Sequence, residues 1–83
     1  MKVTVKYFAS IREDMGIASE VVSTSAATLA ELRDELLARG AAQAHSLARG
    51  KAVRMALNQV MCEESALLVE ACEVAFFPPV TGG

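Results

Sequence analysis

One stretch of this chain has a strong helix pattern, and strand patterns lie on both sides of it. Thr28 and Glu31 match a capping box, in which the threonine hydroxyl accepts a hydrogen bond from a free backbone N–H and the glutamate reaches back. Apolar side chains then recur at helical spacing, at Leu29, Leu32, Leu36 and Leu37. Arg39 followed by Gly40 is a typical helix end. The pattern predicts one helix over residues 28–39 whose leucine stripe packs against a core.

The first strand pattern is also the clearest. Residues 2–8 alternate, so that one face carries Val3, Val5 and Tyr7 and the other carries Lys2, Thr4, Lys6 and Phe8. Further strands are predicted at residues 20–24, 53–57, 60–62 and 73–77. Asn58 and Gln59 are expected to form the tight turn between two of them, although glutamine suits a positive φ less well than asparagine.

The remaining segments have weaker patterns. Residues 10–15 predict a short helical turn, with Ile11 and Met15 on one side and Gly16 as its end. Residues 41–49 fit either a short irregular helix or a loop. Residues 63–71 are expected to form a loop from which Leu67 and Leu68 both point inward.

This order of elements favours one main helix packed across one mixed sheet, since that is the economical architecture for a chain of 83 residues. The first and last strands can lie side by side in parallel, because the helix supplies the crossover between them. This is the α+β arrangement of the β-grasp, or ubiquitin-like, roll. We expect residues 1–77 to form the β-grasp domain and residues 78–83 to extend from it as a tail.

Composition narrows the possible partners. The chain is 53% hydrophobic, which is high for one small domain and indicates that some apolar side chains remain available to a partner. The net charge is −2 and there is no run of Lys or Arg, which argues against nucleic acid and anionic membranes as ligands. No apolar run approaches the roughly 20 residues that span a bilayer, and residues 1–6 lack a signal-peptide pattern. We therefore expect a cytoplasmic protein.

The sequence offers little for catalysis or metal binding. Cys62 and Cys72 do not form a CxxC pair and are expected to be reduced, partly buried thiols rather than redox or sulfur-relay groups. His45 is the only histidine and is most simply a surface residue. Zinc usually needs four clustered ligands, so a metal site is not expected.

The end of the chain differs from the rest in its chemistry. From Val74 to Gly83 there is no ionisable side chain, so the terminal carboxylate is the only charge on this arm. Pro78 and Pro79 stiffen the arm, and glycine has no Cβ, so a partner can close on the backbone at Gly82 and Gly83. An end without function is the alternative, because last residues are commonly disordered. The lead-in Phe76-Phe77-Pro78-Pro79-Val80-Thr81 favours a tail that delivers its carboxylate into a partner's narrow active site.

The strand patterns also predict a docking surface at the root of this tail. Phe8 lies on the lysine-bearing face of its strand, and Phe77 has the opposite parity from Val74 and Phe76. If the first and last strands are neighbours, Phe8 and Phe77 meet on the exposed face, where Met61 can join them. The alternative is that one aromatic side chain is buried in the small core.

Three sequence blocks resemble the small subunit of molybdopterin synthase. The strongest is Phe76-Phe77-Pro78-Pro79-Val80-Thr81-Gly82-Gly83, preceded by Glu73-Val74-Ala75, and it is similar to the C-terminal signature of that family. Residues 2–13 resemble the opening strand and turn of the family, and residues 56–59 resemble its mid-chain turn. One departure is visible, because Glu70-Ala71-Cys72-Glu73 lacks the glycine that the family often has before the last strand.

The resemblance implies a sulfur carrier of molybdenum cofactor biosynthesis. An E1-like adenylyltransferase would use ATP to adenylate the Gly83 carboxylate, and a sulfur donor would convert it to a thiocarboxylate. The tail, from Pro78 and Pro79 through Val80, Thr81 and Gly82, would insert into the large catalytic subunit and give its sulfur to cyclic pyranopterin monophosphate. Phe8, Met61, Phe77 and Arg12 would contact that subunit. The chain would bind no cofactor and would be a co-substrate rather than an enzyme alone.

Three alternatives remain open from the sequence. The first is a carrier for thiamine or another sulfur pathway, which would also end in Gly-Gly. The second is a ubiquitin-like modifier joined to lysines of target proteins through the same activated terminus. The third is a binding module in which the two glycines have no chemical role.

Overall fold

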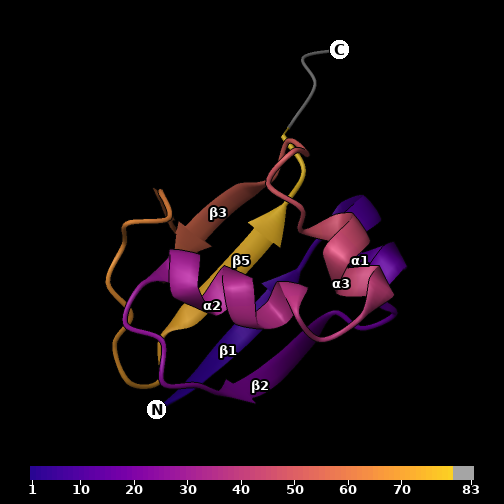
Figure 1. Ribbon diagram of the computed structural model, residues 1–83. Coiled ribbons are helices and arrows are strands. Elements are labelled where there is room, and N and C mark those ends of the chain that lie inside the picture. Colours follow the sequence, from indigo (N-terminus) through magenta and orange to yellow (C-terminus); the bar gives the residue numbers. More distant parts are fainter. Residues whose placement is uncertain (80–83) are drawn as a thin grey trace.

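Five strands form one mixed sheet in the computed structural model, which describes residues 1–79 (Figure 1). The strand order is β2-β1-β5-β3-β4. The first and last strands, β1 and β5, are parallel neighbours, and the other pairs are antiparallel, so the predicted pairing is confirmed. The strands are β1 Lys2–Tyr7, β2 Ser19–Ser23, β3 Arg54–Leu57, β4 Val60–Cys62 and β5 Glu73–Phe77.

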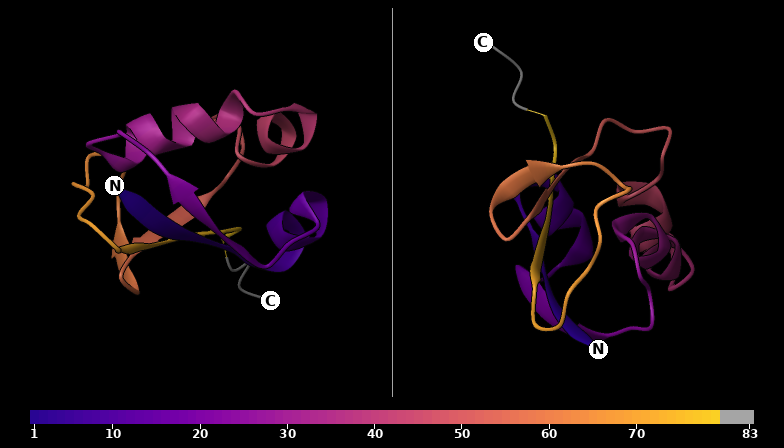
Figure 2. Two further views of the ribbon diagram at one scale, coloured as in Figure 1. Left: turned by 90° about the horizontal axis from the view of Figure 1, so that it is seen from below. Right: turned by 90° about the vertical axis from the view of Figure 1, so that its left-hand side faces the viewer.

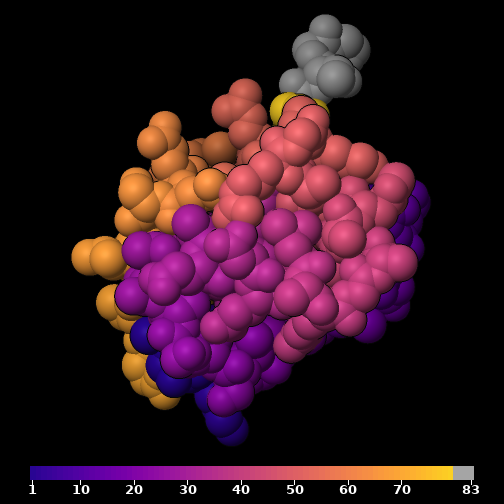
Figure 3. Space-filling model, viewed as in Figure 1, coloured from indigo at the N-terminus to yellow at the C-terminus, as the bar shows by residue number. Residues whose placement is uncertain are grey.

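Helices cover one side of this sheet, while no described element covers the other side (Figure 2). They are α1 Ala9–Met15, α2 Leu29–Leu37 and α3 Ala41–Ser46. The ambiguous region after residue 40 therefore begins with a short helix. In the space-filling view, the side chains of α2 and α3 form the visible surface over the sheet (Figure 3). The fold is the predicted α+β β-grasp roll, with one open sheet face.

The start of α2 follows the predicted capping pattern with one difference. Thr28 is the N-cap residue, and its hydroxyl accepts from the Glu31 N–H at 3.3 Å. The Glu31 carboxylate reaches back to the N–H of Ala27, also at 3.3 Å, one residue earlier than a capping box requires. The leucine stripe lies in the core as predicted, with Leu29, Leu32 and Leu36 fully buried.

The alternation of β1 decides which of its side chains enter the core. Val3, Val5 and Tyr7 are buried beneath the helices, and the Tyr7 ring is stacked on Phe76 of the neighbouring strand with centroids 6.3 Å apart. The other parity, which includes Lys6, faces the open side. There the Lys6 ammonium pairs with Glu73 of β5 at 3.3 Å. One short strand thus supplies both the core and the open face.

Two turns use left-handed backbone at residues other than glycine. Asn58 and Gln59 have φ values of 49° and 68°, which is the tight turn predicted between β3 and β4. Ala71 has a φ of 64° in the turn before β5. The Ala71 N–H donates to the Lys2 carbonyl at 2.9 Å, so the turn keeps its place against β1 at the cost of local strain.

One core prediction is wrong. Leu68 is buried, with 7% of its surface exposed, but Leu67 is 69% exposed. The segment is extended here, since Leu67 forms a β-bridge with Thr28 and the Leu68 N–H donates to the Ala27 carbonyl at 2.9 Å. Neighbouring side chains of an extended chain point to opposite sides, so only one of the two leucines can enter the core.

The position of β5 sets the origin of the tail. This strand lies between β1 and β3, and its C-terminal end is at the opposite end of the sheet from the chain's N-terminus (Figure 1). The predicted tail residues Val80, Thr81, Gly82 and Gly83 lie outside the described residues. None of the described helices is long and apolar enough to cross a membrane.

Candidate functional site

The root of the tail is held at the end of the central strands. The Phe8 N–H, one residue past the last paired residue of β1, donates to the Phe76 carbonyl of β5 at 3.2 Å. On the other side, Phe77 pairs with Arg54 of β3. Pro78 follows, half-buried, and borders a crevice of about 80 Å³ between α1 and the segment that leads into β3. The chain therefore leaves the domain from a fixed point.

Phe8 and Phe77 meet at this point, as the parity of their strands predicted. Their rings pack edge to face, with centroids 6.4 Å apart and planes at 87°. The Phe8 side chain is 46% exposed and Phe77 is half-buried, so neither aromatic ring is buried in the core. Ala9, with a φ of 51°, turns the chain from β1 into α1 directly after Phe8. The pair forms an apolar surface at the tail's root, and its role in docking stays a prediction.

Met61 shares this face but is separate from the aromatic pair. It is 56% exposed and pairs with Ala56 of β3, which in turn pairs with Ala75 of β5. Both alanines lie on the open side and are buried. Since neighbouring strands are about 4.8 Å apart, Met61 lies roughly 10 Å across the sheet from the strand of Phe77. A partner would need a wide surface to reach both.

Arg12 lies next to the same surface, on α1. Its N–H donates to the Phe8 carbonyl at 3.2 Å, so it is one helical turn beyond that aromatic residue. Its side chain is exposed and makes no ion pair within residues 1–79. The structure thus brings together Phe8, Phe77 and Arg12 at the root of the tail, with Met61 further along the same sheet face.

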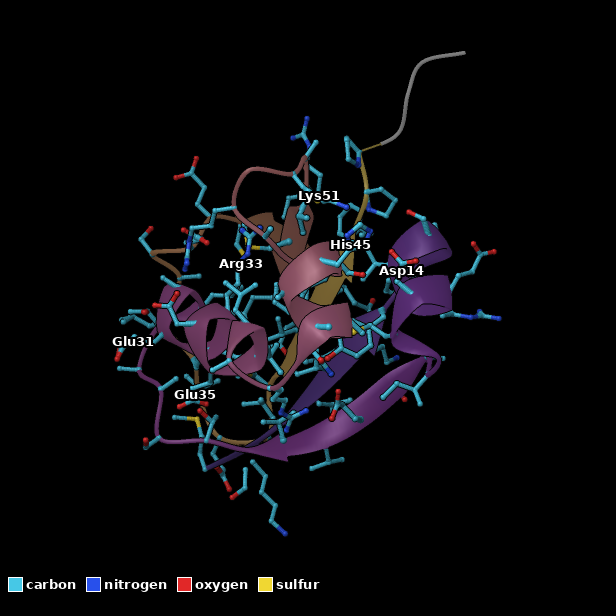
Figure 4. The ribbon with its side chains drawn as sticks, turned by 45° about the vertical axis from the view of Figure 1, so that its right-hand side comes forward. Asp14, Glu31, Arg33, Glu35, His45 and Lys51 are labelled. Atoms are coloured by element: carbon cyan, nitrogen blue, oxygen red, sulfur yellow. The ribbon has the colours of Figure 1, made fainter. Side chains whose placement is uncertain are left out.

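No catalytic cluster is found in the part of the chain that the structure describes. No group of three His, Cys, Asp or Glu side chains there could hold a metal ion. His45 is exposed, as predicted, and its ring nitrogens lie 3.0 and 3.4 Å from the Lys51 ammonium (Figure 4). Cys72 is buried, and burial raises the pKa of the half-buried Cys62 thiol. A raised pKa leaves less thiolate at neutral pH, which is unfavourable for a relay thiol.

Sequence reasoning missed a buried arginine in α2. Arg33 of α2 is only 4% exposed, and its guanidinium donates to the main-chain carbonyls of Leu47 at 2.8 Å and Ala48 at 3.1 Å. The guanidinium also forms an ion pair with the Glu64 carboxylate at 3.0 Å. Arg49 pairs with the same carboxylate at 2.9 Å. The network ties α2, which carries Arg33 (Figure 4), to the segment between α3 and β3. The one available signal was spacing, because Arg33 is four residues after the buried Leu29.

A second polar network joins β1 and β2 to the segment that follows α2. The Tyr7 hydroxyl donates to Glu20 at 2.8 Å, and Arg39 donates to the same carboxylate at 2.7 Å. Burial, followed by the hydrogen bond to Glu20, raises the pKa of the Tyr7 phenol well above its ordinary value. The phenol therefore stays neutral at physiological pH and acts as a structural donor.

The chain is similar to known proteins along nearly its whole length. The model of the ThiS family matches residues 5–83. The molybdopterin synthase sulfur carrier subunit of Escherichia coli is 37% identical over 81 residues, covering 98% of this chain and 99% of that protein. The subunit of the same name from Haemophilus influenzae is 35% identical over 79 residues, covering 95% of this chain and 96% of that protein.

Solved structures share the fold. A putative molybdopterin converting factor subunit 1 from Pyrococcus furiosus has a TM-score of 0.79 and 26% identity, with 96% of this chain and 99% of that chain covered. A protein–protein complex of subunits 1 and 2 of the molybdopterin-converting factor from Helicobacter pylori includes a chain with a TM-score of 0.69 and 27% identity, covered completely in both directions.

Proposed function

Because the chain belongs to the ThiS family, we propose that it is the sulfur carrier subunit of molybdopterin synthase. The resemblance to the small subunit of molybdopterin synthase is confirmed by this membership together with the two relatives of that name. One observation carries the proposal: two proteins of that name are 35% and 37% identical to this chain from end to end. The fold agrees with it, since the central strand β5 leads directly into the Gly-Gly arm.

The proposed chemistry takes place at the Gly83 carboxylate. A carboxylate is a poor electrophile, because oxide would have to leave. Adenylation with ATP by an E1-like partner supplies a better leaving group, and a sulfur nucleophile from a donor then displaces AMP to leave a terminal thiocarboxylate. The ionised sulfur is the nucleophile that reacts with cyclic pyranopterin monophosphate. The chain itself binds no cofactor, and the partners supply the acids, bases and phosphate-binding groups. We place the reaction in the cytoplasm.

The proposed complex joins the tail's root to the large subunit. Pro78 and Pro79 would lead the arm into the partner's active site, followed by Val80, Thr81, Gly82 and Gly83. Phe8, Phe77 and Met61 would bury their exposed apolar surface there, and Arg12 would lie at the rim. Support comes from the edge-to-face aromatic pair, which is exposed beside the point where the arm leaves the domain.

Mass spectrometry of the C-terminal peptide tests this function directly. Peptide from cells that contain the adenylating enzyme should carry sulfur in place of one terminal oxygen, and peptide from cells without the enzyme should not. An unaltered terminus in both would contradict the proposal, while isopeptide-linked products alone would favour a protein modifier.

Two variants test the role of the C-terminal residues Gly82 and Gly83. One extra alanine after Gly83 should abolish sulfur loading with the fold intact, because the activated carboxylate would be displaced. Gly82→Val should block transfer through its bulk near the reacting carbon. Full activity of the extended chain would show that Gly83 is not the reactive residue.

A further inference from the structure

Arg54, the first residue of β3, carries a guanidinium that the described part of the chain leaves without a carboxylate. Its side chain is exposed, and its register partner on β5 is Phe77 of the aromatic pair. No ion pair or side-chain hydrogen bond involves Arg54 within residues 1–79. Three other arginines each pair with a carboxylate of this chain, namely Arg33 with Glu64, Arg39 with Glu20, and Arg49 with Asp34 and Glu64.

The surroundings of Arg54 place it on the open sheet face. Opposed residues of paired strands point to the same side, so Arg54 shares the face of Phe77. It also shares an open groove of about 570 Å³ with Met61. Glu63 and Glu64 border this groove, but Glu64 already accepts from two other arginines and neither forms an ion pair with Arg54. Arg54 therefore lies between the two apolar parts of the docking surface.

A charge in this position matters once the apolar side chains around it are covered. An exposed guanidinium has no desolvation penalty while water surrounds it. Docking of a partner on Phe77 and Met61 would remove that water. An arginine buried without a partner is strongly unfavourable, whereas its planar fork binds a carboxylate through two parallel hydrogen bonds. Arginine is accordingly one of the residue types that dominate interface energy. The partner's surface must therefore supply a negatively charged group that pairs with the Arg54 guanidinium.

We propose that Arg54 pairs with a carboxylate of the large subunit, beside the opening that receives the tail. The pair would fix the rotation of the domain on its partner, since Arg12 and the aromatic pair lie on one side of the tail's root and Arg54 on the β3 side. A partner with a neutral or basic surface at this place would be rejected by the unpaired charge. The proposal rests on the proposed function only for the identity of the partner.

Neutralising the charge tests the proposal, with a control at the far end of the same face. Arg54→Gln and Lys2→Gln each lower the net charge by one, and Lys2 is exposed and has no ion pair among the described residues. Calorimetry with the large subunit should show about tenfold weaker binding for Arg54→Gln, which corresponds to about 1.4 kcal/mol. Lys2→Gln should change the affinity less than about twofold. Equal effects of the two substitutions would overturn the proposal.

A charge swap identifies the carboxylate and guards against a folding artefact. Arg54→Glu should bind the native large subunit poorly, and a large subunit in which the paired carboxylate is replaced by arginine should restore the binding. Thermal melts establish that each variant is folded. If no acidic residue around the opening couples with Arg54, the proposal is wrong. If the unaltered chain does not bind the large subunit at all, the proposed function fails instead, so the two failures are distinguishable.

Discussion

Replacing Arg33 by methionine should cost this small domain a large part of its stability. The substitution keeps an apolar stem of similar length but removes the donors to the Leu47 and Ala48 carbonyls, at 2.8 and 3.1 Å. Hydrogen bonds from a charged donor contribute about 1.5–3 kcal/mol each. Because Ala48 is half-buried and water can replace part of its bond, we expect a total loss of about 3 kcal/mol. The ion pair with Glu64 adds little, since Arg49 still neutralises that carboxylate.

Arg49→Met is the matched control, because it removes the other arginine from the same Glu64 carboxylate. Arg49 is largely exposed, so its loss should cost less than about 1 kcal/mol. Urea unfolding followed by circular dichroism gives both free energies, provided the slopes with urea agree. For a domain of this size, the loss at Arg33 should also lower the melting temperature by at least about 12 °C. If Arg33→Met costs no more than Arg49→Met, the buried hydrogen bonds do not stabilise the fold as argued.

Three further predictions concern the turns, the thiols and the docking surface. Ala71→Gly should stabilise the domain by about 1 kcal/mol, because glycine has no penalty at a φ of 64°; a lower melting temperature would show that this turn is not strained. A chain with Cys62→Ser and Cys72→Ala, supplied already thiocarboxylated, should still convert the precursor, and loss of turnover in a folded variant would reveal a thiol relay. Phe8→Asp should weaken binding to the large subunit by at least about 2 kcal/mol in calorimetry, with an unchanged melting curve; normal binding would exclude Phe8 from the interface.

The amino-acid sequence alone determined the elements whose side chains recur with a fixed period. Alternation over residues 2–8 separates the core residues of β1 from Lys6 and Phe8, and the leucine stripe of α2 lies in the core as its spacing requires. The turn at Asn58 and Gln59 also follows from local chemistry, since asparagine tolerates a positive φ. The family was visible too, because the C-terminal signature is a local string of residues that needs no fold to be recognised.

Contacts between distant segments determine which of two plausible faces is buried. Leu67 and Leu68 have the same hydropathy, and the bridge of Leu67 to Thr28 turns one outward and the other inward. Arg33 carries a charge, which is typical of surface residues. The segment after α3 nevertheless folds back over it and supplies two carbonyl acceptors. The meeting of Phe8 with Phe77 required the parallel register of β1 and β5, which joins residues 69 positions apart. Periodicity shows which side chains share a face of a helix or strand. Packing against segments distant in the sequence determines which face is buried.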